Sequence, residues 1–137
     1  MVNISQAIIK WLNKFKEQQI TTDTLGSETV SYGLFKAPTQ NIKKDILGNV
    51  TCSDYYTFMV RMDNVTDNNM INNQEWMQSL TDWIEEQNNI RNYPDLEEYE
   101  CTGIMVSSPF YMGQAAERSA VYQLTINIRY RKENYKG

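Results

Sequence analysis

The residues from 122 to 131 alternate strictly between large apolar and polar side chains. The apolar series is Tyr122, Leu124, Ile126, Ile128 and Tyr130, and the polar series is Gln123, Thr125, Asn127, Arg129 and Arg131. A period of two predicts a β-strand about 33 Å long, with one face buried and the other facing solvent. Such a strand needs partner strands along its edges and an apolar layer against its buried face.

Four earlier segments have strand-like patterns, namely 28–37, 40–47, 50–62 and 101–106. Pro38 ends the first, and Gly48-Asn49 between the second and third is a hairpin signal. In segment 50–62, one face holds Tyr56, Phe58, Val60 and Met62, and the other holds Tyr55, Thr57, Met59 and Arg61. Because both faces carry large residues, we expect a central strand that is covered on one face and partly covered on the other.

The first element of the chain is predicted to be an amphipathic helix. Its apolar stripe contains Ile4, Ala7, Ile8, Trp11, Leu12 and Phe15. These residues have the spacing of one helical face. Asn3 or Ser5 can cap the start, and we expect the helix to end near Gln18, before a polar connection at 21–27.

A second amphipathic helix is predicted in the middle of the chain. Its inward stripe contains Trp76, Leu80, Trp83, Ile84 and Gln87, with Met77 at the edge of the stripe. We interpret residues 63–73 as a loop running into this helix, with a cap at Asn72 or Asn73. The helix should end at Asn88-Asn89, and both tryptophans should belong to the core.

The predicted order is helix, three strands, helix, two strands, without repeats or a linker, so residues 1–137 should form a single domain. The expected class is α+β, with two amphipathic helices packed on one face of a mainly antiparallel four- to five-stranded sheet. That arrangement leaves the other face of the sheet open. The residues expected on this open face, and hence candidates for a protein interface, are Tyr55, Met59, Gln123, Thr125 and Asn127.

Between the last two strands lies the segment Ser107-Ser108-Pro109-Phe110-Tyr111-Met112-Gly113. Its proline and glycine favour a connection over a strand interior. Large side chains in a connection either pack back on their own domain or dock on a neighbour, and both interpretations remain open. The candidate interface residues here are Pro109, Phe110, Tyr111 and Met112.

The residue types present argue against most catalytic chemistry. The chain has no histidine, which removes the commonest general base and metal ligand. Its two cysteines, Cys52 and Cys101, lie in separate strand segments, and no phosphate-binding, zinc-protease or EF-hand motif occurs. We therefore expect a protein that is not an enzyme and that binds no metal and no cofactor.

The charge and hydropathy of the chain argue against nucleic-acid and membrane binding. The net charge is −4, and the lysine and arginine residues are not clustered enough to bind phosphate backbones. No apolar run reaches the roughly 20 residues that a membrane-spanning helix needs, and the first residues do not resemble a secretory signal.

Six segments of the chain together carry a resemblance to a known protein family. They are Ile8-Ile9-Lys10-Trp11-Leu12, Asp54-Tyr55-Tyr56-Thr57-Phe58, Asn73-Gln74-Glu75-Trp76-Met77, Trp83-Ile84-Glu85, Ser107 to Gly113, and Val121-Tyr122-Gln123-Leu124-Thr125-Ile126. In these segments, which run in order over nearly the whole sequence, the chain resembles a family of small phage and prophage proteins of low-GC Gram-positive bacteria, often labelled minor capsid or tail proteins. The segment from Ser107 to Gly113 is the most specific of the six.

That family is similar to the tail-terminator proteins of long-tailed phages. The resemblance implies a structural virion protein that forms a homohexameric ring on the end of the tail tube. The ring would stop tube polymerisation and join the tail to the head connector, or cap a headless tail of a phage-tail-like bacteriocin (tailocin).

The same resemblance implies the partners and the place of assembly. The partners would be further copies of the chain, the tail tube protein, and the sheath and head–tail connector protein, with DNA only passing through the lumen. Assembly into the virion or tail-like particle would take place in the bacterial host cytoplasm. A head-completion or stopper (neck) protein and a small-ligand-binding regulatory α+β domain remain alternatives.

Overall fold

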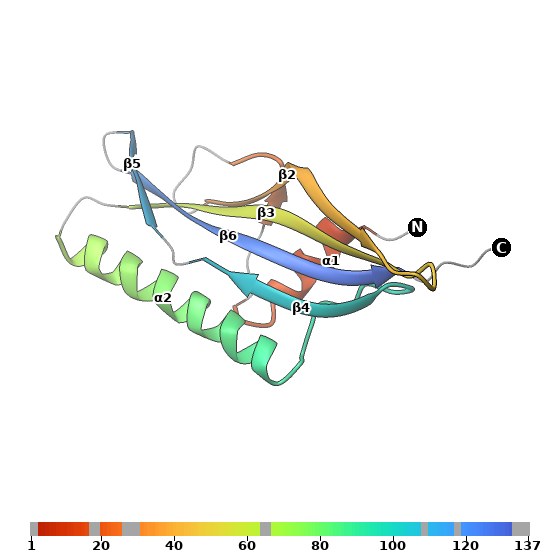
Figure 1. Cartoon of the computed structure of the whole chain (residues 1–137). Helices are drawn as coiled ribbons and strands as arrows, with labels where there is room; N and C mark the ends of the chain where they lie inside the picture. Colours follow the sequence, from red (N-terminus) through yellow and green to blue (C-terminus); the bar gives the residue numbers. More distant parts are fainter. Residues whose placement is uncertain are drawn as a thin grey trace.

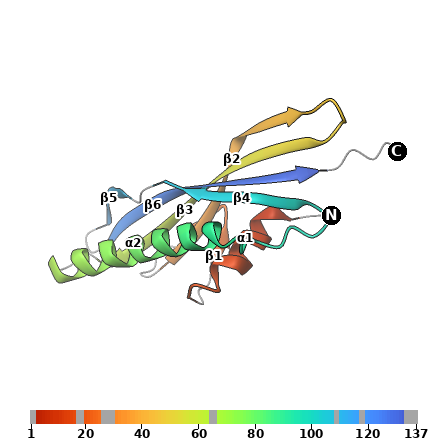
Figure 2. The ribbon, with the colours of Figure 1, turned by 60° about the horizontal axis from the view of Figure 1, so that its bottom comes forward.

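The computed structural model describes residues 3–16, 20–25, 31–63, 67–107, 110–116 and 119–132. In these ranges, six strands form one sheet in the order β1-β2-β3-β6-β4, and β5 also pairs with β6. The strands are β1 (Ile20–Thr22), β2 (Ser31–Lys44), β3 (Val50–Asp63), β4 (Glu100–Val106), β5 (Phe110–Ala116) and β6 (Ser119–Lys132). Helices α1 (Ile4–Leu12) and α2 (Asp67–Asn89) lie on the same face of the sheet (Figures 1 and 2). The predicted α+β class is confirmed, with six strands in place of four or five.

Strands β3 and β6 form the centre of the sheet. They pair antiparallel over their whole length, from Val50 opposite Lys132 to Asp63 opposite Ser119. The alternation predicted from the sequence is confirmed, because the apolar series of both strands is buried beneath the helices. Strand β2 pairs antiparallel with β3 on the other side, while the short β1 pairs parallel with β2.

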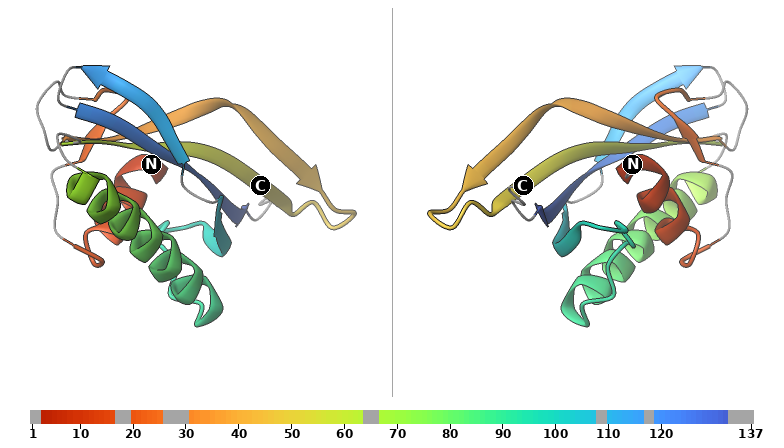
Figure 3. Two further views of the ribbon diagram at one scale, coloured as in Figure 1. Left: turned by 90° about the vertical axis from the view of Figure 1, so that its left-hand side faces the viewer. Right: turned by 90° about the vertical axis from the view of Figure 1, so that its right-hand side faces the viewer.

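The predicted hairpin at Gly48-Asn49 joins β2 to β3. Gly48 has a φ of 90°, a left-handed conformation that glycine adopts without steric cost. Asp45 organises the turn, since its Oδ1 accepts hydrogen bonds from the backbone N–H groups of Leu47 and Asn49, both at 2.9 Å. Figure 3 shows this hairpin extending away from the helices.

The segment predicted as a connection, 107–113, is largely a strand. Strand β5 begins at Phe110, and both β4 and β5 lie along the same edge of β6, one after the other. The register shifts between Tyr111 and Gly113, so Gly113 marks an irregularity inside a strand rather than the end of a loop. The physical reason is that β6 is longer than β4, and β5 pairs with the backbone groups that β4 leaves open.

Two further expectations about the strands are corrected. Pro38 does not separate two strands, because β2 is continuous and its register with β3 shifts between Lys36 and Gln40. Proline is tolerated at such an irregularity because no ladder hydrogen bond is needed from it. The polar connection at 21–27 contains part of β1, and residues 28–30 lie outside the described part of the chain.

Helix α1 is shorter than predicted. Asn3 caps it as expected, with its side chain accepting a hydrogen bond from the backbone N–H of Gln6 at 3.0 Å. The helix ends at Leu12, and the chain then turns tightly, with Phe15 N donating to the carbonyl of Leu12 at 3.0 Å. This turn still brings the Phe15 ring to 5.8 Å from the ring of Trp76 in α2.

Helix α2 is longer than predicted. It begins at Asp67, so Asn72 and Asn73 lie inside the helix and are not its caps. Asparagine is a weak helix former rather than a breaker, and the asparagine-rich start of α2 is therefore compatible with a helix. The end at Asn89 agrees with the prediction.

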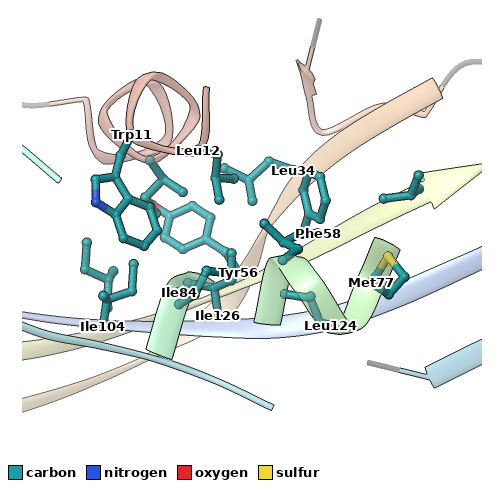
Figure 4. Close-up of a cluster of buried hydrophobic side chains, with 14 of the residues drawn as sticks. Trp11, Leu12, Leu34, Tyr56, Phe58, Met77, Ile84, Ile104, Leu124 and Ile126 are labelled. Carbon is teal, nitrogen blue, oxygen red and sulfur yellow. The ribbon is translucent and has the colours of Figure 1, made fainter. Parts of the chain in front are cut away.

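The core lies between the two helices and the sheet (Figure 4). Trp11 and Leu12 of α1 and Met77 and Ile84 of α2 point toward Tyr56 of β3 and its neighbours. The rings of Trp11 and Trp83 lie 4.8 Å apart, so the two helices also contact each other. Trp76 and Trp83 pack against the core while remaining partly exposed.

Candidate protein-interaction surface

The open face of the sheet carries the five interface candidates of β3 and β6. Their register is direct: Tyr55 lies opposite Asn127, Met59 opposite Gln123, and Thr125 lies between them along β6. All five side chains are partly exposed, and both described helices lie on the other face. The structure thus brings together residues that the sequence places in two distant segments.

Asn127 supports the interpretation of this face as a contact surface. Its side-chain Oδ1 is shielded from solvent and has no hydrogen-bond partner within the described part of the chain. A buried acceptor without a partner costs about 1–3 kcal/mol. Its neighbours across the strands are Tyr55 and Met105, and Met105 is 45% exposed on the adjacent strand β4.

The segment 107–113 lies next to the same face. Ser107 N donates to the carbonyl of Thr125 at 2.9 Å, and Thr125 N donates to the Ser107 hydroxyl at the same distance. Phe110 is the register partner of Gln123. Pro109 and the side chains of Phe110, Tyr111 and Met112 lie outside what the structure describes, so the choice between self-packing and docking stays a prediction.

The tip of the β2–β3 hairpin is a surface that the sequence interpretation missed. Ile46 is 100% exposed, Leu47 is 81% exposed and Ile42 is 59% exposed. Ile42 lies on the helix side of the sheet, opposite the buried Cys52, yet it stays exposed because the helices do not extend beneath the hairpin (Figure 3). The available signal was the Ile46-Leu47 pair directly before Gly48-Asn49, since apolar residues are unusual in a turn.

A polar cluster lies at the base of the hairpin. Asp54 is 1% exposed, and its carboxylate accepts hydrogen bonds from the Tyr130 hydroxyl at 3.0 Å and from the Gln40 amide. Gln40 also donates to the Tyr130 oxygen at 3.1 Å. Burial, together with the negative charge of Asp54, raises the pKa of Tyr130 well above its usual range. The cluster ties β2, β3 and β6 together just beyond the irregularity in β2.

A shallow cleft of about 540 Å³ lies against the outer side of α1. It is lined by Asn3, Gln6, Ala7, Lys10, Trp11, Lys14, Asp95 and Glu97. The two lysines balance the two acids, so the cleft has no strong preference for one sign of charge. The Trp11 indole N–H is already satisfied by the carbonyl of Asn92 at 2.8 Å.

Neither a metal centre nor a membrane span is present in the described ranges. No group of three or more Cys, Asp or Glu side chains there could hold a metal ion. No described helix is both long and apolar enough to cross a bilayer. Cys52 and Cys101 are free thiols, and burial raises the pKa of Cys101 to about 11, which keeps this thiol unreactive near neutral pH.

Comparison with known proteins adds no further assignment: no protein-family model matches the chain, and no curated protein matches it significantly.

Proposed function

We propose that the chain is a structural assembly protein of the tail-terminator type, which forms a ring on the end of a tail tube and stops its growth. In a phage the ring would join the tail to the head connector, and in a headless particle it would cap the tail. The sequence resemblance in segments 8–12, 54–58, 73–77, 83–85, 107–113 and 121–126 suggests this class, and the fold is compatible with it.

The observation that carries the proposal is a continuous, largely uncharged surface on the open side of the sheet. It runs from Tyr55 and Met59 on β3 across Gln123 and Thr125 on β6, and the backbone of Ser107 adjoins it. Uncharged surfaces with aromatic residues and methionine are typical of interface centres. A closed ring requires two different patches on each copy, and this molecule has a sheet face on one layer and a helix face on the other (Figure 2).

Deletion of the gene from the phage or tail-like particle that encodes it tests the proposal. Loss of a terminator should leave tubes of uncontrolled length in electron micrographs, and re-expression of the wild-type chain should restore uniform tails. Tails of normal length after deletion would contradict the proposal. Normal-length tails that fail to join heads would instead support the stopper alternative.

Variants of the open face test the surface itself. The double substitution Tyr55→Ala and Met59→Ser should abolish tail-length control while leaving the circular dichroism spectrum of the purified protein unchanged, because both side chains are only partly buried. Lys14→Ala, on the exposed side of the chain following α1, is a matched control that should retain function. Full function of the double variant would remove this face from the proposal.

The cleft beside α1 is the feature that favours the small-ligand alternative. Trp11 and several polar side chains line it. A thermal-shift screen with a small-metabolite library addresses this directly. A reproducible stabilisation that Lys10→Ala abolishes would favour the regulatory domain over the terminator.

A further inference from the structure

The hairpin tip, defined here as residues 42–49, combines exposed apolar side chains with positive charge. Ile46 is fully exposed and Leu47 is 81% exposed, and the exposed Lys43 and Lys44 precede them on opposite faces of the end of β2. Arg129, near the end of β6, is a further exposed cation. It lies close to the hairpin, since its register partner is Ser53 of β3. Exposed isoleucine and leucine at a projecting tip mark a contact surface rather than an ordinary turn.

The tip is also pre-organised. The Asp45 carboxylate holds the backbone N–H groups of Leu47 and Asn49, and Gly48 N donates to the Asp45 carbonyl at 3.1 Å. These hydrogen bonds lower the pKa of Asp45, with the bond from Asn49 as the largest cause. A rigid tip loses little conformational entropy when it docks.

The outer face of α2 has the opposite charge. The helix from Asp67 to Asn89 contains no lysine or arginine. Among the side chains of α2 that the structure describes, the exposed acidic residues are Glu75, Asp82, Glu85 and Glu86. Asp82, Glu86 and Ile90 follow one another at intervals of four, which places them on one stripe, and Ile90 is 63% exposed where the helix ends. The C-terminal half of α2 therefore offers three exposed acids, and the exposed Ile90 and Arg91 follow them directly beyond the end of the helix.

We propose that the hairpin tip of one copy docks on the C-terminal half of the outer face of α2 of a second copy. Lys43 and Lys44, whose side chains extend from opposite faces of β2, would reach Glu85 and Glu86 from the two sides of the tip, and the Ile46-Leu47 pair would cover Ile90. The tip and α2 lie apart on the molecule (Figure 3), so one copy cannot satisfy its own pair of patches. The contact is head-to-tail, a type that builds a ring when its rotation closes. It deepens the proposed function, on which its biological role rests.

Charge reversal tests the contact by sedimentation velocity of the purified full chain over a concentration series. Lys43→Glu with Lys44→Glu should weaken association by about tenfold or more, because two attractive pairs become repulsive. Combining them with Glu85→Lys and Glu86→Lys should restore it. The matched control Glu75→Lys, on the other half of α2, should change association by less than about twofold. Unchanged association of the lysine variant, or a failed restoration, overturns the proposal.

Disulfide trapping gives a second readout that does not depend on affinity. In a Cys101→Ala background, equal amounts of an Ile46→Cys chain and a Glu86→Cys chain should form a mixed disulfide dimer under mild oxidation. Ile46→Cys mixed with Glu75→Cys should not. Absence of the mixed dimer when the Ile46→Cys and Glu86→Cys chains are oxidised together at high concentration also overturns the proposal.

The two hypotheses can fail separately. Uncontrolled tail length after gene deletion, restored by a tip variant as well as by the wild type, would retain the terminator and reject the hairpin contact. Tip-dependent association in solution together with normal tail length after deletion would retain the contact and reject the terminator. Circular dichroism of each variant checks that it folds. We expect all variants to fold, because the substituted side chains are exposed.

Discussion

Tyr130 near the end of β6 donates a 3.0 Å hydrogen bond to the carboxylate of Asp54 in β3, where Asp54 is almost completely buried. Gln40 of β2 reaches the same carboxylate across the neighbouring strand. One polar side chain from each of three adjacent strands therefore meets at the base of the hairpin. A buried carboxylate is tolerated there because hydrogen-bond donors surround it.

Removing the Tyr130 hydroxyl should destabilise the protein. Tyr130→Phe leaves one oxygen of Asp54 without its donor, and we expect a loss of about 1–3 kcal/mol in the free energy of unfolding, measured with urea. Tyr55→Phe is the matched control, since its hydroxyl accepts only a long 3.4 Å hydrogen bond from Asn41 at the surface. The control should lose less than about 0.5 kcal/mol. Equal losses would show that the buried cluster has no special role.

Gly33 should tolerate no side chain. A Cβ at this position would lie 2.2 Å from the backbone carbonyl oxygen of Thr24, so Gly33→Ala must displace the chain that carries β1. We expect a loss of about 1–3 kcal/mol from overpacking. Gly103→Ala is the control, because its nearest atom would be Asn88 Oδ1 at 3.8 Å, an ordinary contact. A fully stable Gly33→Ala protein would contradict the close approach of the two segments.

Asn88 should be important for joining α2 to the sheet. Its Oδ1 accepts a hydrogen bond from the backbone N–H of Ile104 in β4 at 3.0 Å. Asn88→Ala leaves this partly buried donor without its acceptor, at a cost of about 1–3 kcal/mol in unfolding free energy. Asn89→Ala changes the exposed neighbour and should be nearly neutral. Faster amide hydrogen exchange at Ile104 in the Asn88 variant alone would locate the effect.

The Cys101 thiol should make stability fall at alkaline pH. Burial raises its pKa from 9.0 to about 11, so the folded state favours the neutral thiol. Below pH 9.0 the thiol is neutral in both states and the contribution is intact; above it the unfolded chain ionises first, and stability is lost until the pH reaches about 11. Cys101→Ala should therefore lose less stability than the wild type between about pH 8 and about pH 10.5. Equal slopes for both proteins would contradict the raised pKa.

The sequence predicted the central strands and the inward face of both helices correctly. Met59 and Tyr55 share a face with Gln123 and Asn127, as predicted. This prediction followed from the period of two in each strand and from the expected pairing of the strands. The helix and strand boundaries were less accurate. Leu12 ends α1 where a tight turn replaces the last helical turns expected, and Asp67 begins α2 within a run of weak helix formers.

The chain by itself determined which side chains of β3 and β6 are buried, because alternation along a strand depends only on neighbouring residues. Only the tertiary structure decided that residues 110–116 form a strand, because the open edge of β6 that they pair with is not visible in their own sequence. The same holds for the exposed hairpin tip. Ile42 faces the helix layer, but its exposure depends on where α1 and α2 stop beneath the sheet, and that is fixed by long-range packing.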